Sequence, residues 1–199
     1  MSKKQKTTLF VLIAIAICLV LLMAAAVWVV RTRFQLKYDD LIRQYSEEYD
    51  LDPSFVAGVI YTESKYRERA VSSAGARGLM QIMPKTAADI AREFGEPFDP
   101  ENPDDLEKLF DPETSIRYGC HYLRQQLDRF DQNEAVTLAA YNGGPENAAK
   151  WLNQYGLDSK GQIAYIPFQE TSNYVKRVFQ AQKIYRILYP DALTIKTED

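Results

Sequence analysis

Residues 52–64 read DPSFVAGVIYTES, and this stretch carries the main indications of both fold and function. Asp52 followed by Pro53 is typical of a helix N-cap with proline at the first helical position. Glu63 continues an apolar stripe that recurs at helical spacing, at i+7 from its first member. The apolar members of the stripe are Val56, Val59 and Ile60. We therefore predict a helix that ends with a carboxylate on its apolar face.

The carboxylate of Glu63 has two possible settings at the end of such a helix. Burial removes its hydration, penalises the charged form and raises the pKa, as a general acid working near neutral pH requires. Alternatively, Glu63 extends into solvent or pairs with Arg67, four residues further on. The helix pattern alone leaves both settings open.

Helices are predicted on both sides of this stretch, because apolar residues recur there at three- and four-residue spacing. With the first helix, the predicted helical stretches are residues 38–49, 52–64, 84–94, 111–130, 135–141 and 171–189. Residues 72–78 are predicted as a loop, residues 95–105 as a turn-rich connection, and residues 142–145 as a helix stop. Residues 163–168 are the only candidate strand. The fold class is therefore mostly α, in a single domain.

An apolar run, LFVLIAIAICLVLLMAAAVWVV, precedes the helical domain at residues 9–30. As a helix, these 22 residues extend roughly 33 Å, which is enough to cross the core of a bilayer. Basic residues flank both sides of the run, so the charge pattern does not set the orientation. We predict an uncleaved membrane anchor; the alternative is a secretory signal cleaved near Ala26.

The composition excludes several functional classes. The formal net charge is -3, and the first 33 residues contribute five basic residues and no acid. The remainder carries 19 basic and 27 acidic residues, which argues against nucleic acid as a partner. Cys18, Cys120 and His121 are the only cysteines and histidine in the chain. They are too few for a typical zinc site or a disulfide framework.

Four short motifs follow one another along the helical domain. Glu63-Ser64 is followed by GARGLMQIMP at 75–84, AYNGGP at 140–145 and IPFQET at 166–171. In this order and spacing they resemble the soluble lytic transglycosylase (SLT) family, whose domain is lysozyme-like. The resemblance covers about residues 38–189. The sequence departs from the family pattern at Gly143, where alanine is commoner, and at Ser172, where arginine is usual.

The resemblance implies a role for particular side chains. Glu63 matches the single catalytic acid and base, and Ser72 matches a nearby serine that contacts the substrate. Met80 and Gln81 match residues that line the glycan groove. The full set of implied substrate-binding residues is Ser64, Ser72, Met80, Gln81, Tyr141, Asn142, Glu170 and Tyr174. Ser172 in place of arginine weakens the role assigned to Glu170.

Simpler interpretations stand beside these roles. Met80 and Met83 are also suited to filling the core, Met83 more than Met80. Tyr141 is also compatible with a buried tyrosine whose hydroxyl has an internal partner. His121 lies on the polar side of its predicted helix, and we expect no catalytic role for it.

The resemblance implies a membrane-anchored lytic transglycosylase that cuts the β-1,4 bond between N-acetylmuramic acid and N-acetylglucosamine in peptidoglycan, leaving a 1,6-anhydromuramyl product. The expected partners are glycan strands and, through residues 9–30, the membrane; no nucleic acid, metal or cofactor is expected. One alternative is a lysozyme that uses Glu170 as a second carboxylate. Another is a glycan-binding protein without activity, which the presence of Glu63 disfavours.

The apolar run at residues 9–30 and the four motifs together give the expected organisation of the chain. It comprises a short basic cytoplasmic tail (1–8), a transmembrane anchor (9–30), a linker (31–37), an SLT-like catalytic domain (38–190) and a C-terminal tail (191–199). The catalytic domain is expected outside the cytoplasm, facing the cell wall, because peptidoglycan lies there.

Overall fold

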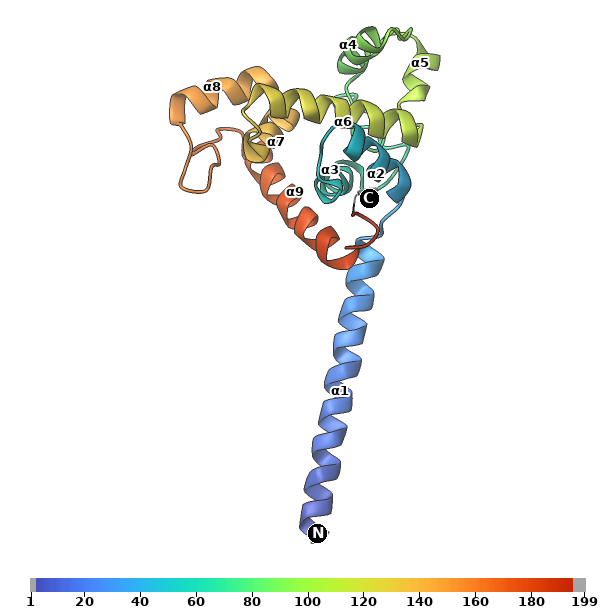
Figure 1. The fold of residues 1–199 in the computed structure, drawn as a ribbon, viewed down its shortest axis with the longest axis vertical. Helices are drawn as coiled ribbons and strands as arrows, with labels where there is room; N and C mark the ends of the chain where they lie inside the picture. The colour runs from blue at the N-terminus through green and yellow to red at the C-terminus, as the bar shows by residue number, and fades with distance from the viewer. Residues whose placement is uncertain (1–2, 195–199) are drawn as a thin grey trace, which may run out of the picture. The chain divides into compact units, whose positions relative to one another are not determined.

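The computed structural model describes residues 3–194 and divides into two compact units, with the boundary between Gln35 and Leu36. The first unit is a single helix, α1 (Lys3–Arg33), drawn in blue in Figure 1. Its apolar side chains are exposed along its whole length. The helix is long and apolar enough to span a membrane, a test that a signal sequence near the N-terminus also passes.

The second unit is an assembly of helices. They are α2 (Asp39–Glu48), α3 (Pro53–Ser64), α4 (Pro84–Phe94), α5 (Pro103–Lys108), α6 (Pro112–Arg129), α7 (Glu134–Gly143), α8 (Pro145–Tyr155) and α9 (Gln169–Leu188). No strand occurs in residues 3–194. The prediction of a mostly α domain is confirmed.

Helix α3 forms the centre of this unit, with α2, α6, α7 and α9 around it (Figure 1). Every residue from Pro53 to Ile60 is buried. It packs most extensively against α9, and Gly58 permits the close approach of the two helices. A Cβ at Gly58 would lie 3.0 Å from the Val178 carbonyl oxygen and 3.0 Å from the Gln182 nitrogen. Residues 61–63 of its last turn are half-buried, so this end of the central helix reaches the surface of the domain.

The sequence cues for helix starts are confirmed at two positions. The Asp52 side chain accepts a hydrogen bond from the Ser54 N–H at 2.7 Å, and Asp111 accepts one from the Thr114 N–H at 2.9 Å. Each cap satisfies a backbone donor that the helix itself leaves without a partner.

The candidate strand at 163–168 does not form; Ile163 takes part in a single bridge with Leu157. Two local predictions are wrong. Residues 95–105, predicted as a turn-rich connection, include the start of α5 at Pro103. Pro145, predicted as part of a helix stop, opens α8, because proline is well tolerated at a first helical position. The last helix begins at Gln169, two residues before the predicted start. Residues 195–199 of the predicted tail lie outside the described part of the chain.

A compact loop joins α3 to α4 and is held by two antiparallel bridges, Val71 with Arg77 and Arg77 with Ile82. Gly78 has a φ of +79°, and a Cβ there would lie 1.9 Å from the Leu109 carbonyl oxygen. The loop is therefore pressed against the end of α5 at a position that only glycine fits. This contact fixes the loop that approaches the end of α3.

Candidate active site

A cleft of about 530 Å³ opens at the C-terminal end of α3. Four separate parts of the chain form its walls: the last turn of α3, the α3–α4 loop, the end of α7 and the start of α9. Its functional lining residues are Glu63, Ser72, Gln81, Met83, Tyr141, Asn142, Phe168, Glu170 and Thr171. The cleft therefore joins residues more than 100 positions apart in the sequence.

Glu63 is a carboxylic acid whose pKa this setting moves into the neutral range. It stands one residue before the end of α3, which Lys65 terminates with a left-handed backbone conformation. Burial raises the pKa of its carboxyl group to about 7, against an opposing effect of the Tyr174 hydroxyl and the Arg177 charge; the negative charge of Glu170 raises it further. A carboxyl group with this pKa is present in both protonation states near neutral pH, as an acid and base in one reaction requires.

The alternative of an ion pair between Glu63 and Arg67 is wrong. The Arg67 guanidinium instead donates its Nε–H to the Ser64 carbonyl oxygen at 3.0 Å. Arg67 therefore does not neutralise the Glu63 carboxylate. Burial favours the protonated form of this carboxyl group.

Two hydrogen bonds hold the far wall of the cleft in place. The Tyr141 hydroxyl donates to the Met80 carbonyl oxygen at 2.8 Å, which ties the end of α7 to the α3–α4 loop. The Thr171 hydroxyl donates to the Asn142 side-chain oxygen at 2.8 Å, which ties α7 to the start of α9. These bonds connect elements that surround Glu63 and limit their movement relative to one another.

Tyr174 lies beneath the cleft, on α9. Its ring is buried, and its hydroxyl makes no hydrogen bond of standard geometry to any residue of the described chain. The same hydroxyl lies close enough to Glu63 to lower the pKa of that carboxyl group. It is thus a donor held beside the carboxylate with no competing partner.

A comparison with protein families identifies the domain that contains this cleft. The family model for the transglycosylase SLT domain matches residues 40–163.

The chain belongs to the transglycosylase SLT domain family.

Relatives of this SLT domain cover much of the chain but extend well beyond it. The soluble lytic murein transglycosylase of Escherichia coli K12 is 36% identical over 165 residues, which are 82% of this chain and 25% of that protein. The membrane-bound lytic murein transglycosylase C of Mannheimia succiniciproducens is 29% identical over 75% of this chain and 47% of its own length. The chain thus spans about a quarter of the length of the first of these relatives.

Solved structures show the same fold. The 70-kDa soluble lytic transglycosylase of Escherichia coli matches with a TM-score of 0.72 and 34% identity, over 84% of this chain and 27% of that one. An inactive glutamate-to-glutamine mutant of lytic transglycosylase Slt from Pseudomonas aeruginosa matches with a TM-score of 0.67 and 31% identity, over 79% of this chain and 25% of that one.

Six of the residues predicted for the site line the cleft of the SLT domain together. They are Glu63, Ser72, Gln81, Tyr141, Asn142 and Glu170. Ser72 accepts the Ala76 N–H at 3.0 Å, and the Gln81 amide donates to the Ala70 and Gly78 carbonyl oxygens. The side chains of both residues thus also brace the loop that presents them.

Three predicted residues lie elsewhere. Ser64 is fully buried and donates its hydroxyl to the Ile60 carbonyl oxygen at 3.1 Å. Tyr174 is buried beneath the cleft, as described above. Met80 is also fully buried, packed against Gly119, where a Cβ would lie 2.2 Å from the Met80 sulfur. The prediction that the Met80 side chain lines the groove is therefore wrong; only its carbonyl oxygen takes part, through Tyr141.

Met83 occupies the opposite position. The sequence left a core-filling role open for its side chain, but that side chain is 41% exposed and lines the cleft. Between the two methionines, Gln81 has a φ of +52°, so the backbone changes direction there. The turn sends Met80 inward and leaves Met83 at the cleft.

Phe168, Thr171 and Arg177 were not singled out in the sequence. Phe168 and Thr171 belong to the IPFQET motif, and their place in the cleft was recognisable only from that motif. Arg177 acts on Glu63 from one helical turn beyond Tyr174. His121 lies outside the cleft, with its Nε2 atom 2.8 Å from a Glu93 carboxylate oxygen. Within residues 3–194, no group of three or more His, Cys, Asp or Glu residues is placed to hold a metal ion.

Proposed function

We propose that this chain is a peptidoglycan lytic transglycosylase that cuts the β-1,4 bond between N-acetylmuramic acid and N-acetylglucosamine and releases a 1,6-anhydromuramyl product. The observation that carries the proposal is Glu63, a carboxyl group with a pKa of about 7 at the base of a cleft in an SLT domain. The names of the relatives, lytic murein transglycosylases, support it.

The cleft offers surfaces that suit a sugar chain. Met83 and Phe168 are partly exposed apolar side chains for the faces of sugar rings, at 41% and 51% exposure. Gln81, Asn142 and the Ser72 hydroxyl provide polar groups for hydroxyl and acetamido substituents. A relative, the 70-kDa soluble lytic transglycosylase, has been solved in complex with bulgecin A, which supports the view that this fold binds ligands.

Glu63 carries both proton transfers in the proposed mechanism. In the first step its carboxyl group protonates the glycosidic oxygen, and the bond to the muramyl anomeric carbon breaks as positive charge develops there. The Glu63 carboxylate that results is stabilised by the Tyr174 hydroxyl and the Arg177 charge, the two groups that lower its pKa. These groups stabilise the ionised form, which is the form that the first step produces.

In the second step the Glu63 carboxylate accepts the proton of the muramyl 6-hydroxyl. That oxygen attacks the anomeric carbon of its own sugar and closes the 1,6-anhydro ring, so no water is consumed and Glu63 regains its proton. An internal nucleophile has an effective concentration on the order of 10⁵ M or more when well oriented. This advantage removes the need for a second carboxylate as nucleophile or base.

A lysozyme reaction is the second candidate, because Glu170 lines the same cleft and its charge acts on Glu63. Hydrolysis in the usual way requires a second carboxylate at a defined separation. Glu170 is exposed at the start of α9 and has no cation supplied by residue 172, which is serine.

The products of peptidoglycan digestion distinguish the two reactions. We expect muropeptides from purified peptidoglycan to end in 1,6-anhydromuramic acid, lighter by one water than lysozyme products and resistant to borohydride reduction at that end. Mass spectrometry after digestion in ¹⁸O-labelled water measures both properties. Reducible ends that carry the labelled oxygen would establish the lysozyme reaction and make Glu170 the first residue to test.

We also propose that α1 is an uncleaved, single-pass anchor that holds the SLT domain on the side of the membrane facing the cell wall. The length and apolar character of Lys3–Arg33 support the span, and the membrane-bound relatives support the location. Its exposed apolar side chains need a lipid environment, because an apolar helix of this length is not stable alone in water.

Fractionation of cells tests this anchor. The full-length chain is expected in the membrane fraction and is expected to stay there after washing with high salt or carbonate, because apolar burial in lipid is not screened by ions. Immunoblots of the washed membranes measure this. A shorter species in the soluble fraction, with an N-terminus near Ala26, would show that the segment is a cleaved signal.

A further inference from the structure

The exposed face of α9 differs in charge from the rest of the helical unit. After Glu170, this helix carries two lysines, two arginines and no acidic residue. Beyond its first 33 residues the chain holds 19 basic and 27 acidic residues, so a long helix with cations alone is unusual for it. The four cations, all of them exposed, are Lys176, Arg177, Lys183 and Arg186.

Three exposed residues of α9 lie on the side of the helix that points away from the core. The helix packs mainly against α3 and α7, through buried residues that include Val178 and Tyr185, and it forms one edge of the helical unit in Figure 1. Lys176, Lys183 and Ile187 follow at spacings of seven and four residues, which places them together on the opposite side. We call these three residues the α9 stripe; it extends over about 16 Å.

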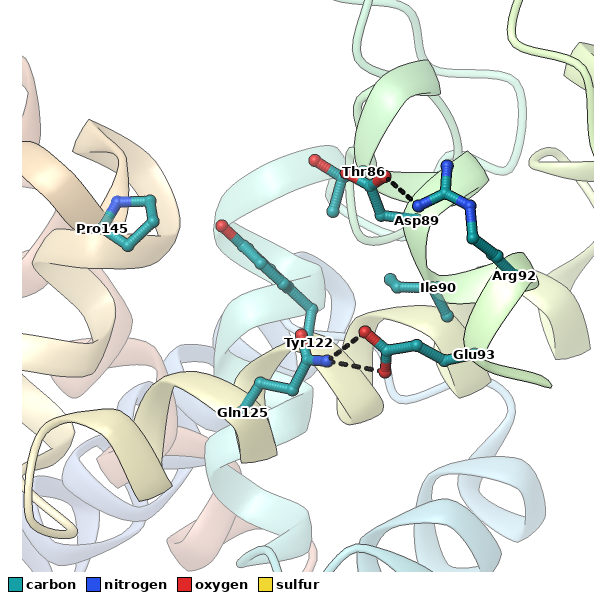
Figure 2. Close-up of a pocket in the computed structure, with 8 residues that line it drawn as sticks. All are labelled: Thr86, Asp89, Ile90, Arg92, Glu93, Tyr122, Gln125 and Pro145. Atoms are coloured by element: carbon teal, nitrogen blue, oxygen red, sulfur yellow. Dashed lines mark hydrogen bonds and ion pairs between the residues drawn. The ribbon is translucent and has the colours of Figure 1, made fainter.

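The two lysines of the α9 stripe have no acidic partner. On another exposed surface, between α4 and α6, the charges are paired: Figure 2 shows Asp89 accepting a hydrogen bond from Arg92, at 3.0 Å. By contrast, neither Lys176 nor Lys183 forms an ion pair with any residue within 3–194. Positive charge that the protein does not neutralise attracts a surface of negative charge.

An apolar side chain completes the α9 stripe. Ile187 is 67% exposed, more than any other large apolar side chain between residues 36 and 194. Basic residues beside an exposed apolar residue are typical of helices that lie on a lipid surface, where the cations meet the headgroups and the apolar group enters the boundary below them. A soluble polyanion would bind the lysines but would offer no apolar region to Ile187. The stripe therefore fits an anionic lipid surface better than a polymer.

The C-terminal end of α9 lies near the point where the chain enters the helical unit. The Tyr38 hydroxyl donates a hydrogen bond to Glu68, and two residues earlier the ring of Tyr66 lies 6.0 Å from the ring of Tyr185 on α9. The chain between the end of α1 and Tyr38 can extend no more than about 18 Å. A membrane span formed by α1 would therefore keep this end of α9 close to the lipid surface.

We infer that the α9 stripe lies on the anionic headgroups of the membrane that α1 crosses. The inference rests on the anchor proposed above and adds a second contact with the same membrane. A basic residue at an anionic lipid surface strengthens binding about fivefold, so two lysines are enough to favour one orientation of the SLT domain over others. Arg177 and Arg186, on either side of the stripe, add to the positive charge of this face.

Acetylation of lysines in nanodiscs tests the inference. The full-length chain is reconstituted in nanodiscs of neutral phosphatidylcholine, and in nanodiscs that also contain anionic phosphatidylglycerol. Both faces of a nanodisc are open to the reagent, so the direction of insertion does not matter. After a short pulse of an acetylating reagent, mass spectrometry gives the rate of modification at each lysine. Lys85 on α4 and Lys150 on α8 are exposed and serve as internal controls.

The expected result is protection of the α9 stripe alone. In anionic nanodiscs the rates at Lys176 and Lys183 should fall roughly threefold or more, because lipid contact shields the amines and negative charge favours their unreactive protonated form. The rates at Lys85 and Lys150 should stay nearly unchanged. High salt should restore the rates at the stripe, since it screens the attraction.

Ile187→Gln tests the apolar part of the stripe without changing its charge. This variant should recover at least half of the lost rate at Lys183 in anionic nanodiscs, because the contact that holds this end of α9 on the lipid is gone. Full protection of Lys183 in the variant would show that lipid does not receive the isoleucine and would contradict that part of the inference.

Other outcomes overturn the inference as a whole. Equal rates in both kinds of nanodisc, or equal protection of all four lysines, would exclude a specific contact of the stripe with lipid while the proposed anchor stands. Protection by soluble polyglutamate in neutral nanodiscs, with none from anionic lipid, would assign the stripe to an anionic polymer instead. If the chain separates from the nanodiscs during size-exclusion chromatography, the proposed anchor itself fails, and the inference fails with it.

Discussion

Glu63→Gln is expected to reduce the rate of peptidoglycan cleavage by at least 100- to 10,000-fold, the usual contribution of a positioned acid or base. Glutamine keeps the shape of the side chain but neither donates nor accepts the proton in either step. Because the same carboxyl group serves both steps in the proposed mechanism, the upper end of the range or beyond is expected. Release of soluble muropeptides per unit time, with binding measured separately, gives the size of the loss.

Glu101→Gln is a suitable control for this experiment, since Glu101 is exposed in the α4–α5 connection, away from the cleft. It should cleave at the parental rate. A Glu63→Gln protein that retains near-parental turnover would contradict the assignment of Glu63 as the acid and base. Retained sugar binding together with lost turnover would locate the effect in the chemical step.

The same substitution has a predictable effect on stability that depends on pH. The pKa of Glu63 is about 7 in the folded state and near 4.5 in the unfolded chain, so the folded protein binds this proton more tightly. Stability therefore falls as the pH rises between these values. Glu63→Gln removes that loss, and above pH 7 it should raise the free energy of unfolding by about 1 to 3 kcal/mol relative to the parent. At pH 5 the gain should be much smaller.

Gly78→Ala is expected to destabilise the helical unit by about 2 to 5 kcal/mol, the largest effect on stability that we predict. The backbone at Gly78 has a φ of +79°, which costs an alanine about 1 kcal/mol or more. The added Cβ would also lie 1.9 Å from the Leu109 carbonyl oxygen and 2.8 Å from the Ser115 hydroxyl oxygen. Backbone cannot move aside as a flexible side chain does, so the loop must shift.

This shift should also lower activity, because the same loop presents Gln81 and Met83 to the cleft. Gly75→Ala is the matched control in the same loop. Its φ is +91°, but no heavy atom lies within 4 Å of the added Cβ, so only the backbone strain applies. Thermal unfolding of the full-length proteins in detergent, followed by circular dichroism, compares them. Equal melting temperatures for the two variants would contradict the proposed contact with Leu109.

Some features of this protein depend on neighbours in the sequence, and these were predictable. Asp52-Pro53 and Asp111-Pro112 start helices because their capping bonds join residues two or three positions apart. The place of Glu63 on the apolar face of its helix follows from the helical repeat alone. The four motifs, read in order, indicated the SLT family and six of the residues that line the cleft.

Other features depend on contacts between residues far apart in the sequence, and only the tertiary structure decided them. Met80 is buried because Gly119 leaves room for its sulfur, and Met83 lines the cleft because the backbone turns at Gln81. The Tyr141 hydroxyl finds its acceptor 61 positions away, at the Met80 carbonyl oxygen. The raised pKa of Glu63 likewise requires α9 and its charges beside α3. Periodicity shows which face of a helix is apolar, whereas burial and proton affinity depend on which elements pack against that face.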